Sequence, residues 1–324
     1  MDSLGCVERL APKDPPLHPG LRQRIERDFT PRWNDQWGGK FVLHGSAPGT
    51  NAVRLDGNDY LSVTGHPDIV AAQVASLTRN TDFVVQSGVF LLQEHPSRAL
   101  EQSLADWVGK DDALVCQSGY AANVGLLQSI AGPDMPVFLD TLAHTSLWEG
   151  ARRAGATTHP FRHNDAEHLD RLVQRHGAGL IVVDSVYSTT GAVAPLVQVV
   201  EVAERRGCMT LVDESHSLGT HGPQGAGLCA ELGLSHRVHF ITASLAKAFA
   251  GRAGFLTVPA AMRNYVLSTS YPNMFSSCLL PHEVAALDAT LEVIRRSDAE
   301  RQRLHAITKR LRADLTELGY PIHQ

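Results

Sequence analysis

Apolar runs and helical stretches alternate along most of this chain. Runs of consecutive apolar residues predict short buried strands, and the stretches between them carry the period of an amphipathic helix. Continuous apolar strands separated by helices are typical of a parallel sheet buried on both faces, with right-handed crossovers placing helices on either side. The pattern therefore predicts an α/β fold. The predicted strands are 113–116, 137–139, 180–183, 210–212, 239–242 and 254–258, and the predicted helices are 123–130, 146–154 and 197–206.

The two ends of the chain depart from this alternation. Residues 1–55 are rich in Pro, Gly, Arg and Trp, with a helical patch at 21–29, and we expect an N-terminal arm or lid there. Residues 56–265 hold the alternating pattern and are expected to form a large domain. The stretch 281–318 is almost entirely helical in pattern, so we expect residues 266–324 to begin a smaller C-terminal domain.

Composition and charge exclude several classes of protein. The chain has 324 residues, of which 43% are hydrophobic and 19% charged, as in an ordinary globular protein with a large core. A net charge of −5 gives no basic surface for nucleic acid. The first residues do not form a signal peptide, and the apolar runs are too short to span a membrane. The five cysteines are scattered and never form a CxxC pair, which predicts reduced thiols in the cytoplasm. Cys116 and Cys208 are expected to be buried, and the other three are Cys6, Cys229 and Cys278.

Asp213 ends the predicted strand 210–212, and His216 follows closely. In open α/β sheets ligands bind at the carboxyl ends of the strands, so Asp213 is placed where a ligand would lie. Three interpretations remain open for this segment. Asp213 is a loop or helix-capping acid, it contacts an organic cofactor, or it forms a metal site with His216 and His221.

Lys247 lies just after the predicted strand 239–242, among Ala, Leu and Phe residues. Apolar surroundings disfavour the ammonium form, and a neutral lysine is what a Schiff base with an aldehyde requires. A helix-end lysine whose amine reaches water is the ordinary alternative. Ser244 and Lys247 also match the S-x-x-K pattern of acyl-enzymes, although the partner tripeptides S-D-N and K-T-G do not occur.

Three further strand ends carry polar residues. The turn 118–120, Ser-Gly-Tyr, lies between a strand and a helix, where backbone amides and the helix dipole can hold a phosphate. His144 can stack on a planar ring or cap a helix, and Ser185 is explained equally well by turn chemistry. In this order, together with Asp213 and Lys247, they describe a pyridoxal phosphate site. The acid would partner the ring nitrogen and the lysine would bind the aldehyde.

On these residues the sequence resembles the α-oxoamine synthases, pyridoxal phosphate enzymes of fold type I that join an amino-acid-like substrate to an acyl-CoA. The resemblance runs from Asn58 to the end of the chain. The surroundings of Trp148 and His221 resemble most the α-hydroxyketone-type autoinducer synthases of quorum sensing. The most specific stretches are 143–152, 174–177, 213–222, 245–249 and 275–279.

The resemblance implies a large domain with a mostly parallel seven-stranded sheet flanked by helices, and an incomplete C-terminal domain. It assigns Lys247 to the cofactor aldehyde and the substrate α-proton, Asp213 to the ring nitrogen, and His144 to stacking on the ring. No metal is implied. The remaining roles are contacts to the phenolic oxygen (His216, Ser185), to the phosphate (Ser118, Gly119, Tyr120, Ser244), to the phosphate of the neighbouring subunit in a homodimer (Ser277), and to the substrate (Asn58, Tyr60).

The implied reaction joins an amino donor, S-adenosylmethionine or a small amino acid, to a medium-chain acyl-CoA. The product would be an α-aminoketone or amino-enone, the precursor of an autoinducer. The alternatives are another α-oxoamine synthase, of the 8-amino-7-oxononanoate synthase or 2-amino-3-ketobutyrate CoA ligase type, or a truncated non-catalytic remnant. Residues 86–93 replace a Gly-rich, Arg-containing turn of the family, and they either line an acyl channel or belong to the core.

Overall fold

The computed structural model describes residues 15–36, 38, 49–53, 57–79, 85–91, 95–320 and 322. Contacts divide the chain into two units, residues 1–57 and 58–324. In the first unit, α1 (Pro19–Arg24) continues into two π-helical turns, Ile25–Phe29 and Arg32–Gln36. The helical patch predicted at 21–29 is therefore confirmed. Cys6 lies outside the described residues.

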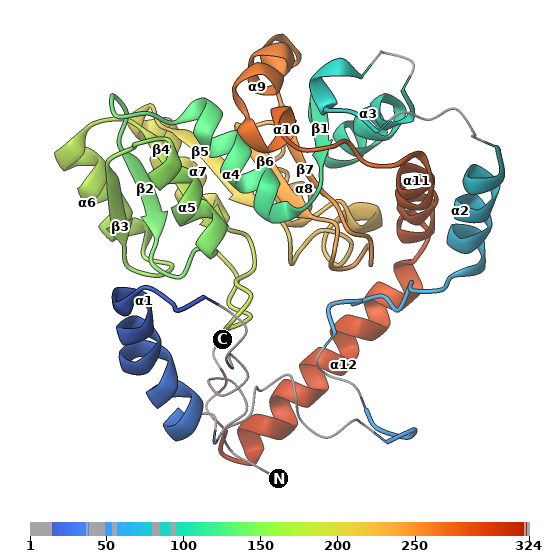
Figure 1. Ribbon diagram of the computed structural model, residues 1–324, viewed down its shortest axis with the longest axis horizontal. Helices are drawn as coiled ribbons and strands as arrows, with labels where there is room; N and C mark the ends of the chain where they lie inside the picture. Colours follow the sequence, from blue (N-terminus) through green and yellow to red (C-terminus); the bar gives the residue numbers. More distant parts are fainter. Residues whose placement is uncertain are drawn as a thin grey trace. The chain divides into compact units, whose positions relative to one another are not determined.

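The second unit is built on one seven-stranded sheet (Figure 1). Its order is β1-β7-β6-β5-β4-β2-β3, and every neighbouring pair is parallel except the two that involve β7. The predicted α/β fold with a mostly parallel sheet is confirmed. The strands are β1 (Asp112–Cys116), β2 (Val137–Asp140), β3 (Thr158–Phe161), β4 (Leu180–Asp184), β5 (Met209–Asp213), β6 (Phe240–Ser244) and β7 (Gly254–Val258).

Helices cover both faces of this sheet. On one face α4, α5 and α9 pack against the strands, and on the other α6 and α7 lie over one half and α3 and α11 over the other half. The helices are α2 (Pro67–Arg79), α3 (Pro96–Val108), α4 (Gly119–Ile130), α5 (Thr145–Arg153), α6 (Ala166–His176), α7 (Leu196–Arg206), α8 (Leu228–Glu231), α9 (Arg263–Thr269), α10 (Tyr271–Met274), α11 (Pro281–Arg295) and α12 (Asp298–Glu317), with 3-10 turns at Gly88–Phe90, Pro223–Gly225 and Ala260–Met262.

The apolar runs of the sequence are explained by burial on both faces. In β5, Leu211 packs into the core under α4 and α5, whereas Val212 packs into the core under α6 and α7. Successive side chains of a strand point to opposite faces, so a strand covered on both sides is apolar throughout. Cys116 and Cys208 are buried as predicted, and burial raises the pKa of the Cys116 thiol to about 12.

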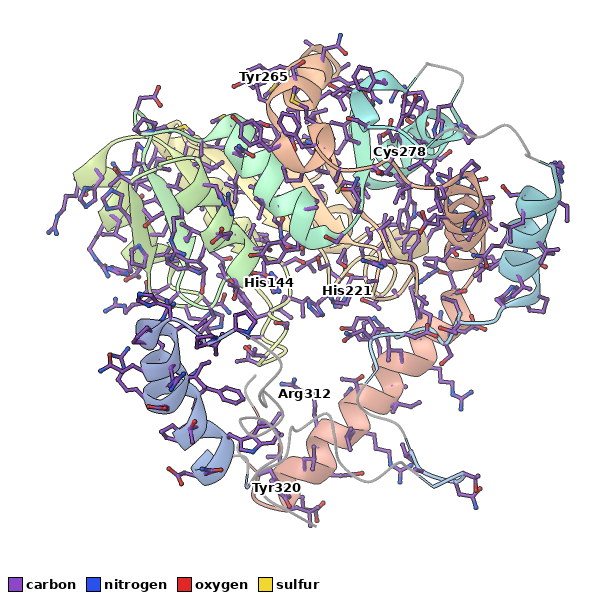
Figure 2. All side chains as sticks on the ribbon, viewed as in Figure 1. His144, His221, Tyr265, Cys278, Arg312 and Tyr320 are labelled. Atoms are coloured by element: carbon purple, nitrogen blue, oxygen red, sulfur yellow. The ribbon has the colours of Figure 1, made fainter. Side chains whose placement is uncertain are left out.

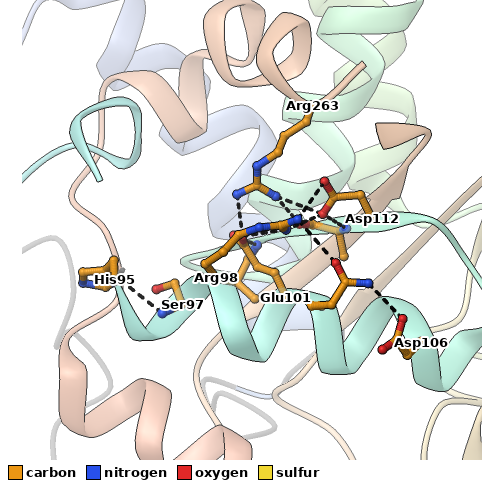
Figure 3. Close-up of polar contacts among 10 residues, drawn as sticks. His95, Ser97, Arg98, Glu101, Asp106, Asp112 and Arg263 are labelled. Atoms are coloured by element: carbon orange, nitrogen blue, oxygen red, sulfur yellow. Dashed lines mark hydrogen bonds and ion pairs between the residues drawn. The ribbon is translucent and has the colours of Figure 1, made fainter. Parts of the chain in front are cut away.

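A buried ion cluster joins α3, β1 and α9 (Figure 3). Arg263 contacts the carboxylates of Glu101 at 2.5 Å and Asp112 at 3.1 Å, and Arg98 contacts Asp112 at 2.5 Å. Arg263 also donates a hydrogen bond to the carbonyl of Ala113, at 2.8 Å. Both acids are buried, and burial raises the pKa of Glu101 although the arginines oppose this. The cluster fixes the edge strand β1 to the helices on its two sides.

The helical pattern predicted at 281–318 is present as α11 and α12. Within the described residues, no helix has both the length and the apolar character needed to cross a membrane.

Candidate functional site

The residues singled out in the sequence follow strands that all end at one edge of the sheet. Strands β2, β4, β5 and β6 are parallel, and β1 has the same direction because β7 is antiparallel to both of its neighbours. The carboxyl ends of parallel strands form the usual ligand-binding edge of an α/β sheet. Figure 2 marks one of these residues, His144, where α5 begins.

Asp213 is a buried carboxylate at the end of β5. One oxygen accepts a hydrogen bond from the side chain of Asn123 at 2.6 Å, and the other accepts one from the backbone N–H of Ser215 at 2.8 Å. Among the described residues, no cationic side chain pairs with Asp213. A carboxylate oxygen can accept more than one hydrogen bond, so Asp213 retains capacity for a further donor.

Asn123 contacts Asp213 directly and was not singled out in the sequence analysis. It lies one turn after Gly119 on α4, and it is fully enclosed. Its amide nitrogen donates to Asp213 and to Ser146, and its carbonyl oxygen accepts from Thr242 at 2.5 Å. The available signal was a polar residue inside an otherwise apolar helical stretch, on the same helix face as Gly119.

Asp184 lies beside Asp213, because the two are paired residues of β4 and β5. Burial and the negative charge of Asp213 raise the pKa of Asp184 well above its ordinary value. The backbone N–H of His144 donates to Asp184 at 2.9 Å, which opposes this shift and fixes the start of α5. The sequence analysis did not single out Asp184, although it also ends an apolar strand.

His144 is the N-cap residue of α5, and its side chain is exposed. Its Nδ1 lies 2.7 Å from the hydroxyl of Ser146 and accepts from the backbone of Ser146 at 3.3 Å. The ring of Tyr120 stands edge-on to it, with ring centroids 6.5 Å apart. The helix-capping interpretation of His144 is therefore confirmed, and its exposed ring leaves stacking on a cofactor as a prediction.

His216 and Lys247 come together from the turns after β5 and β6. Burial lowers the pKa of His216 to about 4, and the positive charge of Lys247 is the next largest cause. Asp213 and His144 also influence this pKa, so the four groups share one neighbourhood. Lys247 itself is half-buried, beside the buried Ala248 and Phe249, and its amine forms no hydrogen bond or ion pair with a described residue.

The start of α4 packs directly against the end of β6. Ser118 is the N-cap residue, and its hydroxyl accepts a hydrogen bond from the backbone of Ala121 at 3.1 Å. A Cβ atom at Gly119 would lie 2.5 Å from Cβ of Ser244, so a larger residue does not fit there. The helix thus presents its free backbone N–H groups next to the hydroxyls of Ser118 and Ser244, an arrangement suited to an anion.

Ser185 and Ser277 are the two other serines that the resemblance assigns to the cofactor. The hydroxyl of Ser185 is fully buried; it donates to the main-chain carbonyl of Asp213 at 3.0 Å and lies 2.7 Å from the hydroxyl of Ser217. The contact of Ser185 with a cofactor oxygen, which the resemblance implies, stays a prediction. Ser277 is exposed, and its carbonyl accepts a hydrogen bond from the side chain of Gln117.

Asn58 and Tyr60 lie beside this neighbourhood as well. The hydroxyl of Tyr60 is 2.7 Å from Nδ1 of His216 and 3.3 Å from the side-chain carbonyl of Asn58. The two residues predicted to meet the substrate are therefore connected to the site through His216.

The acyl-enzyme interpretation of Ser244 and Lys247 and the metal interpretation of Asp213, His216 and His221 find no supporting geometry in the residues that the structure describes. Ser244 and Lys247 share no hydrogen bond, and the Ser244 hydroxyl instead accepts from the backbone of Ala246 at 3.3 Å. In the described part of the chain, no three His, Cys, Asp or Glu side chains lie close enough together to bind a metal ion. His221 contacts Thr220 and His305 rather than Asp213.

Part of the segment 86–93 lines a cavity of about 590 Å³ between α3, α9 and α10. Gly88, Val89 and Leu91 contribute to its wall, whereas Phe90 is exposed. Residues 92 and 93 lie outside the described residues. Polar and charged side chains supply much of the remaining wall: Ser97, Arg98, Glu101, Gln117, Arg263, Asn264 and Asn273.

These features fit pyridoxal phosphate. Asp213 offers a buried carboxylate without a described cationic partner to the ring nitrogen, and Lys247 offers an amine without a described partner to the aldehyde. The start of α4 offers hydrogen-bond donors to the phosphate, in a space where Gly119 leaves no room for a side chain.

Comparisons of the sequence and of the structure with known proteins point to the same family. The family model for aminotransferase class I and II matches residues 50–324. The CAI-1 autoinducer synthase of Vibrio campbellii is 44% identical over 96% of this chain and 79% of that protein. A protein of Mycobacterium tuberculosis named putative 8-amino-7-oxononanoate synthase 2 is 36% identical over 83% of this chain, which spans only 35% of that protein. The solved serine palmitoyltransferase of Sphingomonas wittichii superposes with a TM-score of 0.77, at 29% identity, over 82% of this chain and 67% of that one.

Proposed function

Because the chain belongs to the aminotransferase class I and II family, and within it to the pyridoxal-phosphate-dependent α-oxoamine synthases, we propose that it condenses an amino donor with a medium-chain acyl-CoA. The product would be an α-aminoketone or amino-enone that serves as an autoinducer precursor. The similarity to CAI-1 autoinducer synthase along nearly the whole chain carries this proposal. For the amino donor we propose S-adenosylmethionine, which the resemblance of the sequence to the autoinducer synthases implies.

When bound, pyridoxal phosphate supplies the electron sink that makes the α-carbon of an amino donor acidic. Lys247 would hold the cofactor aldehyde and take the α-proton from the donor. Asp213 would accept a hydrogen bond from the ring nitrogen and keep that nitrogen protonated. Asn123 and the backbone of Ser215 would orient the Asp213 carboxylate, because each occupies one of its oxygens.

The other predicted residues would hold the cofactor in place. His144 would cover one face of the ring, and His216 would donate to the phenolic oxygen. The phosphate group would lie at the start of α4, near Ser118, Gly119, Tyr120 and Ser244. Ser185 would act through the main chain of Asp213, since its hydroxyl is committed to that carbonyl and to Ser217.

We also infer that the enzyme is a homodimer in which Ser277 contacts the phosphate of the partner subunit. Exposed aromatic side chains support this, because Phe275, Tyr271 and Phe90 are 74%, 59% and 68% exposed and come from neighbouring segments. Large exposed apolar groups of this kind are typical of protein interfaces. The described cysteines are free thiols, which supports a reducing compartment such as the cytoplasm.

The test is a donor competition with the purified holoenzyme. S-adenosylmethionine, glycine, alanine and serine are each supplied with decanoyl-CoA, and free CoA and the product mass are measured. We expect S-adenosylmethionine to give the fastest CoA release. A faster reaction with an ordinary amino acid would favour another α-oxoamine synthase, as the similarity to 8-amino-7-oxononanoate synthase also suggests. No CoA release with any donor would favour the non-catalytic remnant.

Lys247→Ala provides the matched control for this experiment. Loss of the covalent attachment should abolish both CoA release and the visible absorbance of the lysine-bound cofactor. Ser244→Ala keeps Lys247 and removes the hydroxyl of the S-x-x-K pattern, so it should retain the absorbance. If the absorbance persisted in Lys247→Ala, Lys247 would not be the residue that holds the cofactor.

A further inference from the structure

The hydroxyl group of Tyr60 lies against the ring of His216, although 156 residues separate them. Tyr60 Oη and His216 Nδ1 are 2.7 Å apart, and the two rings meet at 42° with centroids 6.1 Å apart. The second contact of the hydroxyl, with Oδ1 of Asn58, is longer at 3.3 Å. His216 Nδ1 is thus the nearer partner of this phenol.

The segment that carries Tyr60 is well fixed. Both carboxylate oxygens of Asp59 accept backbone hydrogen bonds, from Val63 and Thr64, each at 2.9 Å. Leu61 and Val63 are buried in the same core as α3 and α11. Tyr60 therefore reaches His216 from a tight turn with a buried anchor, which is a suitable support for orienting a ring.

The direction of this hydrogen bond follows from the state of both groups. Burial raises the pKa of the Tyr60 phenol, so the phenol keeps its proton at neutral pH. Burial, Lys247 and His144 lower the pKa of His216, against the opposing charge of Asp213, so the imidazole is neutral. A neutral imidazole has one acceptor nitrogen and one donor nitrogen. The single phenol proton has two acceptors within reach, Nδ1 of His216 at 2.7 Å and Oδ1 of Asn58 at 3.3 Å. If it goes to the nearer one, Nδ1, the imidazole proton lies on Nε2.

We propose that Tyr60 is a positioning residue that fixes the tautomer of His216, so that Nε2–H is the donor this ring turns toward the cofactor. Within the described residues, Nε2 forms no hydrogen bond of its own. The inference rests on the proposed function for the identity of the acceptor, and it changes the expected role of Tyr60. The hydroxyl is committed to His216 rather than to the substrate.

The first test measures the tautomer directly, and it does not depend on turnover. The protein is labelled with ¹⁵N-histidine, with and without cofactor, and the His216 signals are identified by their absence in His216→Gln. In the wild type we expect the proton on Nε2. In Tyr60→Phe we expect a mixture of both tautomers and a higher pKa of His216, because a hydrogen bond to the neutral form is lost. A proton on Nδ1 in the wild type, or an unchanged His216 in Tyr60→Phe, would overturn the proposal.

The second test uses the reaction. Loss of the partner that orients a metal-binding histidine typically costs about 10- to 100-fold in activity, and we take that range as the guide for an oriented histidine at this site. We expect a fall of this size in kcat for Tyr60→Phe, with KM for the acyl donor nearly unchanged. In a His216→Gln background, Tyr60→Phe should cause no further loss, since the two residues act as one unit. Additive losses would show that Tyr60 acts independently of His216 and would overturn the proposal.

Tyr265→Phe is the matched control. The hydroxyl of Tyr265 also donates a single hydrogen bond, to the carbonyl of Ser129 at 2.7 Å on α4, away from this site (Figure 2). This variant should leave the His216 spectrum and kcat unchanged. If the wild type showed the expected tautomer but turned over no donor, the positioning inference would stand and the proposed function would fail.

Discussion

At the scale of single residues, Glu214 shows that two neighbouring acids in the sequence can have entirely different surroundings in the fold. It follows Asp213 directly, yet its carboxylate points into a closed space, where one oxygen accepts from the backbone of Cys229 at 2.7 Å. Among the described residues, the other oxygen has no hydrogen-bond partner. A Cβ atom at Gly227 would lie 1.5 Å from that oxygen, so Gly227 is required for the carboxylate to fit.

Glu214 should make the stability of the protein depend on pH. Burial raises its pKa to about 7 from an ordinary value of 4.5. Between these values the folded protein binds more protons than the unfolded chain, so its free energy of unfolding falls as pH rises. The loss attributable to Glu214 is about 3 kcal/mol across this window. We expect Glu214→Gln to remove this component, which urea unfolding at pH 4.5 and pH 8 will measure.

The comparison for that experiment is Glu317→Gln, which changes an exposed carboxylate near the end of α12. His216 contributes in the opposite direction, because its lowered pKa makes stability rise between about pH 4 and pH 6.5. The effect of Glu214 is therefore read from the difference in the free energy of unfolding between wild type and Glu214→Gln at each pH. An identical pH profile in Glu214→Gln would show that Glu214 is not held protonated in the folded protein.

At the scale of elements, the ion cluster in Figure 3 decides how the edge strand β1 is held. Glu101 on α3 and Asp112 on β1 are buried acids, and Arg263 on α9 contacts both of them. A buried ion pair gives little net stability when complete, but the removal of one partner leaves a buried charge uncompensated. The cluster is thus a constraint on how α3 and α9 sit against β1.

Arg263→Met should destabilise the protein by about 3–5 kcal/mol, because Glu101 loses its nearest cation and Asp112 keeps only Arg98. Unfolding in guanidinium chloride at fixed cofactor concentration measures this. The matched control is Arg162→Met, which breaks an exposed pair with Asp165 and should cost less than about 1 kcal/mol. Equal losses in the two variants would contradict a special role for the buried cluster.

The elements themselves were predictable to different degrees. The strand 180–183 is apolar throughout and the strand 254–258 has Thr257 as its one polar side chain, and the structure contains both within one residue of the predicted bounds. β3 was missed because its sequence, Thr-His-Pro-Phe, has no apolar run, and Phe161 is its one fully buried residue. As an edge strand that pairs with β2 alone, β3 tolerates Pro160.

At the scale of the whole molecule, the aromatic residues next to Ser277 predict an interface with a second copy. Phe275→Asp places a charge at the centre of this surface, defined by Phe90, Tyr271 and Phe275, and should weaken dimerisation at least about 10-fold. Analytical ultracentrifugation measures the assembly, and dialysis measures cofactor retention. Cofactor affinity should fall together with dimerisation, because Ser277 would come from the partner subunit.

Leu232→Asp is the control for this prediction, since it adds the same charge at an exposed apolar residue near α8. It should leave both assembly and cofactor retention unchanged. If the Phe275→Asp protein stays dimeric, the dimer interface does not include this surface. If the variant becomes monomeric but binds the cofactor as tightly as the wild type, the partner subunit does not contribute to cofactor binding.

The sequence by itself determined the α/β class, the order of most strands and helices, and the residues that follow each strand. These features depend on local patterns, because an apolar run or a strand-end motif is the same wherever the chain folds. Asp213 and Lys247 belong to this group, since their strands end at the same edge of any parallel sheet.

The tertiary structure alone decided which side chains meet at that edge. Asn123 reaches Asp213 from α4, which packs on the sheet next to β6 and β7, and Tyr60 reaches His216 from a turn anchored in another part of the core. Ser185 points inward to the main chain of Asp213, although its position in the sequence resembles that of the other strand-end residues. Such contacts depend on the packing of distant segments and the direction of each side chain, and neither is encoded in a local pattern.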